Sequence, residues 1–95
     1  MRFMYKFTVP VEQGNVAFAD GTIGKAIDEL IAAAQPEAAY FTMLDGERAG
    51  ILFLETDDAS DFTRLNEPLM AKLDAAIDIL PVQSIDELRR GLGKV

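Results

Sequence analysis

The chain has 95 residues, of which 49% are hydrophobic and 26% charged, a composition that is typical of a single globular domain. Its net charge of −7 and its scattered Lys and Arg residues exclude the clustered basic surface that nucleic acid and anionic membranes require. It has no Cys and no His, which excludes disulfides, thiolate nucleophiles and histidine-based general bases or zinc sites. No apolar run approaches the roughly eighteen residues of a membrane span and no signal-peptide pattern is present, so we expect a cytoplasmic protein.

The first third of the chain predicts a strand, a loop and a helix. Residues 3–9 (FMYKFTV) are rich in aromatic and β-branched side chains and stop at Pro10, which is typical of a strand. Residues 10–21 show no clear period and contain two glycines, which indicates a loop. Residues 22–35 have apolar side chains at helical spacing, and either Asp20 or Thr22 can cap the start of this helix.

The rest of the chain predicts a hairpin, a helix, a strand and a short helix. The strand-like runs 38–44 and 48–56 enclose Asp-Gly, the strongest short signal for a tight hairpin turn. Residues 59–75 have helical spacing, and Pro68 is expected to kink that helix or to restart it with Asn66 as a new N-cap. A strand at 76–82 follows, and then a short helix at 84–93 that begins with the Ser and Glu spacing of a capping box.

This order of elements, β-α-β-β-α-β with a short C-terminal helix, predicts one α+β domain of ferredoxin-like fold over residues 1–95. Both long helices should lie on one face of a four-stranded antiparallel sheet. The hairpin parity then assigns side chains to faces. The covered face receives Phe3, Tyr5, Phe7, Ala39, Phe41, Met43, Gly50, Leu52, Leu54, Ile77 and Ile79. The other face, named the open face below, receives Met4, Lys6, Thr8, Tyr40, Thr42, Ile51, Phe53, Glu55, Asp78, Leu80 and Val82.

The open face is too apolar to be left in water. Met4, Ile51, Phe53, Leu80 and Val82 have no helix over them and form a patch of about 500 Å², near the upper end for a monomer. We therefore expect a homodimer that is joined through the open face, or a higher oligomer that contains this dimer.

The stretches MRFMYKFTVP (1–10) and PLMAKLDAAIDILPV (68–82), together with the order of elements, resemble the dimeric α+β barrel superfamily. Within it the chain is most similar to small bacterial-type members of the muconolactone-isomerase kind and to members without an assigned function. The resemblance implies two ferredoxin-like sheets joined by their open faces, with a cavity that often holds a small organic ligand. Several members rely on a histidine, which this chain lacks, so we expect no haem or other cofactor and carry over no catalytic residue.

The acidic stretch FLETDDASDF (53–62) is the first candidate site. Asp57, Asp58 and Asp61 lie where the second long helix begins, and acids there favour the helix dipole while Asp58 or Ser60 can act as a cap. Their spacing does not match a calcium loop, so we expect no metal site.

The polar side chains of the open face are the second candidate site. Glu55 and Asp78 are the candidates for acid/base catalysis, and the candidates for ligand binding are Lys6, Thr8, Tyr40, Thr42 and Phe53. One hypothesis is binding or isomerisation of a small organic molecule by proton transfer. The alternative is a non-catalytic homo-oligomeric module for ligand binding or assembly, in which these groups form salt bridges and hydrogen bonds at the dimer interface. The strand register decides whether Lys6 meets Glu55 or Asp78.

Overall fold

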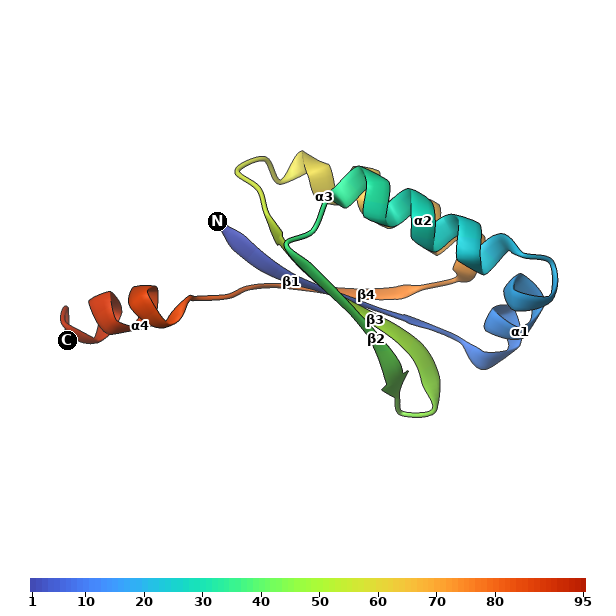
Figure 1. Ribbon diagram of the computed structural model, residues 1–95, viewed down its shortest axis with the longest axis horizontal. Helices are drawn as coiled ribbons and strands as arrows, with labels where there is room; N and C mark the ends of the chain where they lie inside the picture. Colours follow the sequence, from blue (N-terminus) through green and yellow to red (C-terminus); the bar gives the residue numbers. More distant parts are fainter.

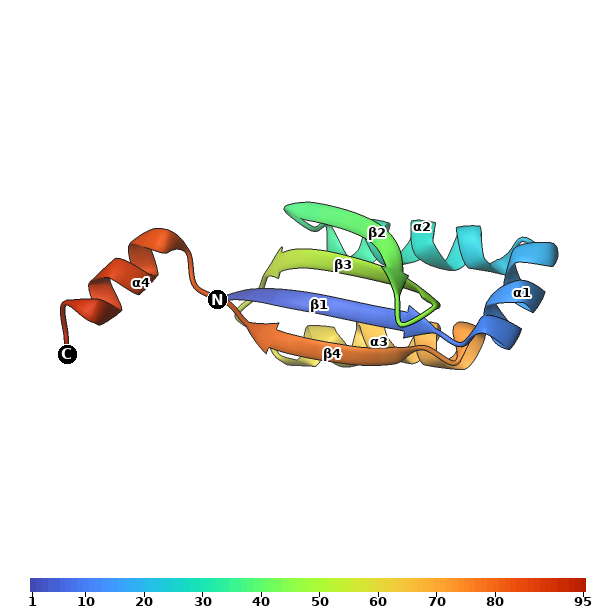
Figure 2. The ribbon, with the colours of Figure 1, turned by 90° about the horizontal axis from the view of Figure 1, so that it is seen from below.

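The computed structural model describes residues 1–95 and contains four strands and four helices. In chain order they are β1 (Arg2–Val9), α1 (Val11–Ala19), α2 (Thr22–Ala34), β2 (Ala38–Leu44), β3 (Glu47–Glu55), α3 (Ser60–Leu73), β4 (Ala76–Pro81) and α4 (Ile85–Leu92). The strands form one antiparallel sheet in the order β2-β3-β1-β4, and the two long helices α2 and α3 cover one face of it (Figures 1 and 2). The predicted α+β ferredoxin-like fold is therefore confirmed. None of the helices is both long and apolar enough to cross a membrane.

The core lies between the sheet and the two long helices. Its side chains come from alternate positions of β1 and β3 and from one stripe of α2 and α3, as the period-2 and period-3.6 patterns predict. The buried core residues are Tyr5, Phe7, Val9, Ala17, Ala26, Leu30, Leu52, Leu54, Leu65, Leu69, Leu73 and Ala75. At one end of this layer the rings of Phe3 and Phe62 meet edge to face, with centroids 4.9 Å apart.

Helix α1 corrects the prediction of a loop at residues 10–21. It begins after Pro10, whose carbonyl accepts a hydrogen bond from the Gly14 amide, and it ends at Asp20. Its buried residues are the small Gly14 and Ala17, three positions apart, so its inner face carries no large apolar side chain that a search for hydrophobic periodicity detects. Asp20, one of the two expected caps of the next helix, does accept a hydrogen bond from the Thr22 amide (2.9 Å).

The β2–β3 hairpin turns at Asp45 and Gly46, which both have positive φ, as the Asp-Gly signal predicts. The expectation that Phe41 and Met43 are core residues is wrong, because 51% and 59% of their surfaces are exposed. Strand β2 is the edge of the sheet and its hairpin end curves away from the helices (Figure 1), so its inward side chains extend beyond the helical layer.

Helix α3 does not restart at Pro68. It runs unbroken from Ser60 to Leu73 with the proline inside it. Pro68 has no N–H to donate to the carbonyl of Arg64, four residues earlier. Both residues lie on the exposed side of the helix, where water can bind this carbonyl. Asn66 is not a cap, since its Oδ1 accepts a hydrogen bond from the hydroxyl of Tyr5 (2.8 Å).

Helix α4 lies beyond the end of the sheet, apart from the other helices (Figures 1 and 2). Its predicted capping box is confirmed, with reciprocal hydrogen bonds between Ser84 and Glu87, yet none of its residues is buried. The radius of gyration is consequently 15.0 Å, whereas a compact chain of this length has about 12 Å.

Candidate functional site

The open face is organised in rows that run across the four strands. Because residues directly opposite each other in a ladder share a face, the pairing places the whole predicted set on the side away from α2 and α3. One row is apolar and consists of Ala38, Phe53, Met4 and Leu80. The next row is more polar and consists of Tyr40, Ile51, Lys6 and Asp78.

Lys6 meets Asp78 and not Glu55. The two residues are opposite each other on β1 and β4, and Lys6 Nζ lies 3.4 Å from Asp78 Oδ2. Their side chains are 32% and 65% exposed, so this is a partly solvated ion pair. The register thus gives the central cation of the open face a partner within its own chain.

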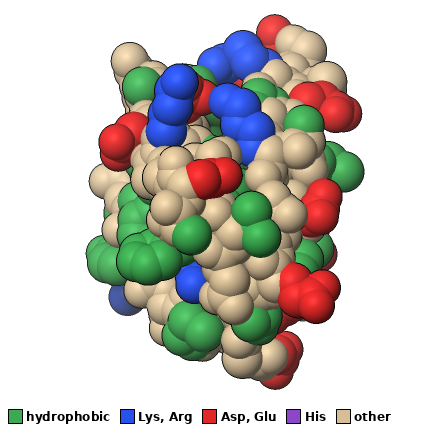
Figure 3. Space-filling view, turned by 90° about the vertical axis from the view of Figure 1, so that its right-hand side faces the viewer, with side chains coloured by type: hydrophobic (Ala, Val, Ile, Leu, Met, Phe, Trp, Pro, Cys, Tyr) green, Lys and Arg blue, Asp and Glu red, His purple; other side chains and the backbone are tan.

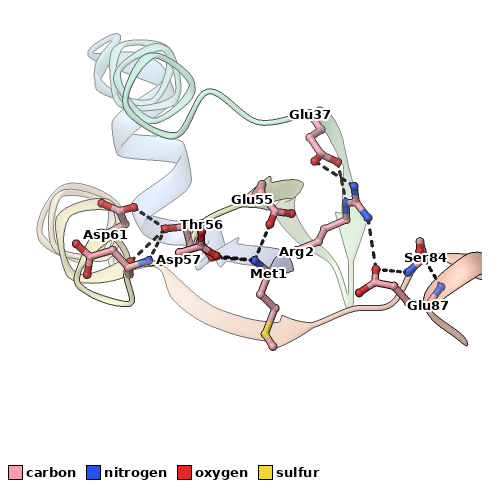
Figure 4. A network of polar contacts seen from close by, with 10 residues as sticks. Met1, Arg2, Glu37, Glu55, Thr56, Asp57, Asp61, Ser84 and Glu87 are labelled. Carbon is pink, nitrogen blue, oxygen red and sulfur yellow. Dashed lines mark hydrogen bonds and ion pairs between the residues drawn. The ribbon is translucent and has the colours of Figure 1, made fainter. Parts of the chain in front are cut away.

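Glu55 lies at the end of the open face and binds the amino group of Met1, a contact that the sequence analysis did not foresee (Figure 4). The Met1 nitrogen lies 2.5 Å from Glu55 Oε1 and 3.1 Å from Asp57 Oδ1. The hydrogen bond to Glu55, followed by the one to Asp57, raises the pKa of this amine above its ordinary value. Glu55 and Asp78, the two catalytic candidates, are therefore each occupied by a cation, and the structure does not bring them together.

The ligand-binding candidates are spread over several rows. Tyr40 shares a row with Lys6, is 63% exposed and makes no hydrogen bond through its hydroxyl. Thr8 and Thr42 lie on either side of Ala49 in the following row. Phe53 belongs to the apolar row. The open face thus combines apolar residues along one row with hydroxyl groups at the opposite end.

A second polar network joins the end of the sheet to α4 (Figure 4). Arg2 donates to Glu37 through Nε (2.9 Å), and its Nη1 lies 4.0 Å from Glu87 of α4. The hydrogen bonds of the capping box, above all the one from the Ser84 amide, hold the pKa of Glu87 below its ordinary value. Glu87 therefore has two roles, since it closes the first turn of α4 and contacts the guanidinium on β1.

The acidic stretch after β3 acts as a helix start. Asp58 Oδ1 accepts hydrogen bonds from the hydroxyl and, secondly, from the amide of Ser60, which lower the pKa of Asp58. Asp61 accepts a 2.7 Å hydrogen bond from the Thr56 hydroxyl. No three acidic side chains of the chain converge in a way that would hold a metal ion.

Three hollows occur in the surface, and none of them lies over the centre of the open face. The largest, about 800 Å³, is the elbow between β4 and α4, and it is named the elbow below. Its lining residues are Met1, Pro81, Val82, Gln83, Ser84, Ile85, Glu87 and Leu88. A groove of about 150 Å³ lies between α2 and α3. A third hollow, of about 250 Å³, lies between α2 and the hairpin.

Arg48 lines the hollow between α2 and the hairpin and is partly buried. The sequence did not indicate this burial, because a basic side chain next to a turn is usually solvated. Its guanidinium donates to Asn15 Oδ1 (3.1 Å) and lies against Gly14, where a Cβ atom would come within 2.3 Å of Nη1. A side chain at position 14 would therefore displace the guanidinium end of Arg48 from its place against α1.

The end of the molecule that carries α1 and the hairpin exposes further hydrophobic side chains. Val11, Val16 and Phe18 of α1 are exposed by 49%, 57% and 72%. Seen from this end, hydrophobic side chains form several separate patches among acidic residues (Figure 3). They do not form one continuous surface comparable with the open face.

No family model matches the sequence, and no curated protein matches it significantly. Among solved structures the chain is similar to the de novo designed protein Ferredog-Diesel, with 10% identity over 85% of both chains and a TM-score of 0.49. It is also similar to the periplasmic divalent cation tolerance protein CutA from Archaeoglobus fulgidus, with 14% identity, 99% of this chain and 97% of that chain covered, and a TM-score of 0.48. Likeness at this level concerns the arrangement of strands and helices and carries no argument about function.

Proposed function

We propose that the chain is a homodimeric assembly module in which the open face of one copy is covered by the open face of a second copy. The observation that carries this proposal is the apolar row of Phe53, Met4 and Leu80 across the sheet, next to Ile51 in the following row. No helix of the chain covers this face of the sheet (Figure 2). Leu80 is 51% exposed, and Met4, Phe53 and Ile51 are partly exposed. A second copy would remove them from water, which is the main favourable term in association.

The charged groups of the open face support assembly over catalysis. Lys6 and Asp78 are already paired with each other, so covering them with a second copy does not bury an unpaired charge. Glu55 is bound by the amine of Met1 and is not aimed at a cavity. Neither catalytic candidate thus stands beside an enclosed hollow in which a substrate would be held.

A second candidate function is binding of a small organic molecule between the two open faces, with proton transfer to or from Asp78. The observation in its favour is the free hydroxyl of Tyr40 in the same row as Lys6 and Asp78. Native mass spectrometry of the purified dimer tests it. A bound organic mass that disappears in Lys6→Met would support this function, whereas an unliganded dimer in both proteins would leave assembly alone.

The assembly proposal is tested by Phe53→Glu, which places an additional carboxylate at the centre of the apolar row. The matched control is Phe18→Glu, the same change at a more exposed phenylalanine of α1, away from the open face. We expect light scattering at about 20 µM to give the mass of a monomer for Phe53→Glu. The control and the wild type should give the mass of a dimer. A dimeric Phe53→Glu protein with unchanged affinity would overturn the proposal.

A further inference from the structure

Helix α4 is an amphipathic arm without a partner in its own chain. Ile85, Leu88 and Leu92 recur at intervals of three and four, which places them on one side of the helix. They are 59%, 43% and 63% exposed. The remaining positions carry the charged side chains of Asp86, Glu87, Arg89 and Arg90, and Gly91.

A helix of this length does not hold itself together in water. Isolated helices shorter than about 12 residues are marginal even with good helix formers, and most of their stability in proteins comes from packing of the apolar side. The capping box and the 4.0 Å Asp86–Arg89 pair add only small increments. The apolar side of α4 therefore needs a surface against which to pack.

That surface is not the open face of the same chain. Val82 is still held to the sheet, since its amide donates to the Arg2 carbonyl (3.0 Å), and Ser84 is already the N-cap of α4. Only Gln83 lies between them. In this outward direction the first turn of α4 lies beside β1, with Arg2 Nη1 4.0 Å from Glu87 Oε1. One free residue is too short a link to reverse the chain and lay α4 back over its own strands.

The apolar side of α4 instead continues the open face. Val82 lies opposite Arg2, two positions beyond the Met4–Leu80 pair, so its side chain belongs to the open face. The elbow next to it is lined by Val82, Met1 and, from α4, Ile85 and Leu88. A second copy that covers the open face therefore meets the elbow and α4 as an extension of the same apolar surface.

We propose that α4 and the elbow pack against the second copy, so that α4 of each chain in the dimer contacts the other chain. This inference rests on the proposed function and names the part of the chain that completes the interface. The sheet face alone measures about 20 by 25 Å, or about 500 Å². One side of an eight-residue helix, about 12 Å long and 10 Å wide, adds about 120 Å². The sum, about 620 Å², reaches the roughly 600–1,000 Å² that each partner contributes to a stable interface, whereas the sheet alone falls short of it.

The first test is the variant Ile85→Ala/Leu88→Ala/Leu92→Ala, which removes the apolar side of α4 but keeps its helix propensity. The matched control is Asp86→Ala/Arg89→Ala, which removes the exposed ion pair of the same helix and leaves the net charge unchanged. Sedimentation equilibrium should give a dimer dissociation constant at least about 100-fold higher for the triple variant, and within about threefold of wild type for the control.

The second test is hydrogen exchange of the α4 amides in the wild-type chain at concentrations above and below that dissociation constant. We expect protection above it and nearly free exchange below it. Protection that does not depend on concentration would place the arm on its own chain and overturn the inference. An unchanged dissociation constant in the triple variant would overturn the proposed contact of α4 with the second copy, while the sheet-to-sheet dimer would stand. A wild-type chain that stays monomeric would overturn both proposals.

Discussion

The hydroxyl of Tyr5 donates a 2.8 Å hydrogen bond to Asn66 Oδ1 and so joins the central strand of the sheet to the middle of α3. Tyr5 is completely buried, whereas Asn66 is partly exposed. We predict that Asn66→Ala lowers the free energy of unfolding by about 1–3 kcal/mol, because it leaves the buried hydroxyl without an acceptor. Tyr5→Phe should lower the free energy of unfolding by less, because water can reach the side-chain amide of Asn66 that this change leaves without its partner.

Urea denaturation of the two single variants and of Tyr5→Phe/Asn66→Ala measures this relation as a double-mutant cycle. The double variant should be more stable than Asn66→Ala alone, because neither polar partner remains unpaired. Additive losses would show that the hydrogen bond does not link the sheet to α3.

Burial also raises the pKa of Tyr5 above its ordinary value of 10.0. In Tyr40→Phe, which leaves Tyr5 as the only tyrosine, ultraviolet absorbance should therefore show no ionisation near pH 10 while the chain is folded. The folded state holds the proton more tightly than the unfolded state, so this group stabilises the fold below pH 10 and the stabilisation is lost as the pH rises further. A reversible ionisation near pH 10 without unfolding would contradict the burial of Tyr5.

Helices α2 and α3 are joined by a 2.8 Å contact from Lys72 Nζ to Glu29 Oε2. This hydrogen bond, followed by the charge of Lys72, lowers the pKa of Glu29 from 4.5. We predict that Lys72→Met returns the pKa of Glu29 towards that value in an NMR titration of its side-chain carboxyl. Lys25→Met, which removes a smaller charge effect, should change it less.

The sign of the Glu29 effect fixes its pH range. Because the folded state releases this proton more readily, the contribution is present above pH 4.5 and is lost as the pH falls through the lower folded pKa. Wild type and Lys72→Met should therefore differ in stability at neutral pH and converge in acid. A difference that persists unchanged at low pH would rule out the ion pair as its origin.

Gly50 is the position where the sheet tolerates no side chain, because a Cβ atom there would lie 2.4 Å from the ring of Phe7. We predict that Gly50→Ala destabilises the chain by about 1–3 kcal/mol through overpacking. The control is Gly24→Ala in α2, where a Cβ atom meets nothing within 4 Å, and it should stabilise the chain by up to about 1 kcal/mol. Thermal unfolding of both variants checks the pair, and equal effects would contradict the close approach of Phe7.

The sequence predicted the elements whose signals are local and strong. Apolar periodicity identified α2 and α3, Asp-Gly identified the hairpin, and the Ser84–Glu87 spacing identified α4. Helix α1 was missed because its buried side is made of Gly14 and Ala17, which carry no large apolar side chain. A pattern that is defined by large apolar side chains does not detect a helix whose buried residues are small.

The candidate site could be predicted as a face but not as a set of contacts. Hairpin parity placed Lys6, Glu55 and Asp78 on the open face, which the strand pairing confirms. Which of the acids meets Lys6 depends on the register between β1 and β4, and these strands are far apart in the chain and joined by no short turn. The capping box likewise predicted where α4 begins, but it does not specify what the apolar side of that helix packs against.

Both the dimer and the role of α4 require that the chain pairs with itself. Sedimentation equilibrium of the wild-type chain at low micromolar concentration measures this without any substitution. We predict a mass of twice the 10.4 kDa of the single chain, with dissociation on dilution. A mass of 10.4 kDa at every concentration would mean that the open face and α4 remain uncovered, and it would contradict both proposals.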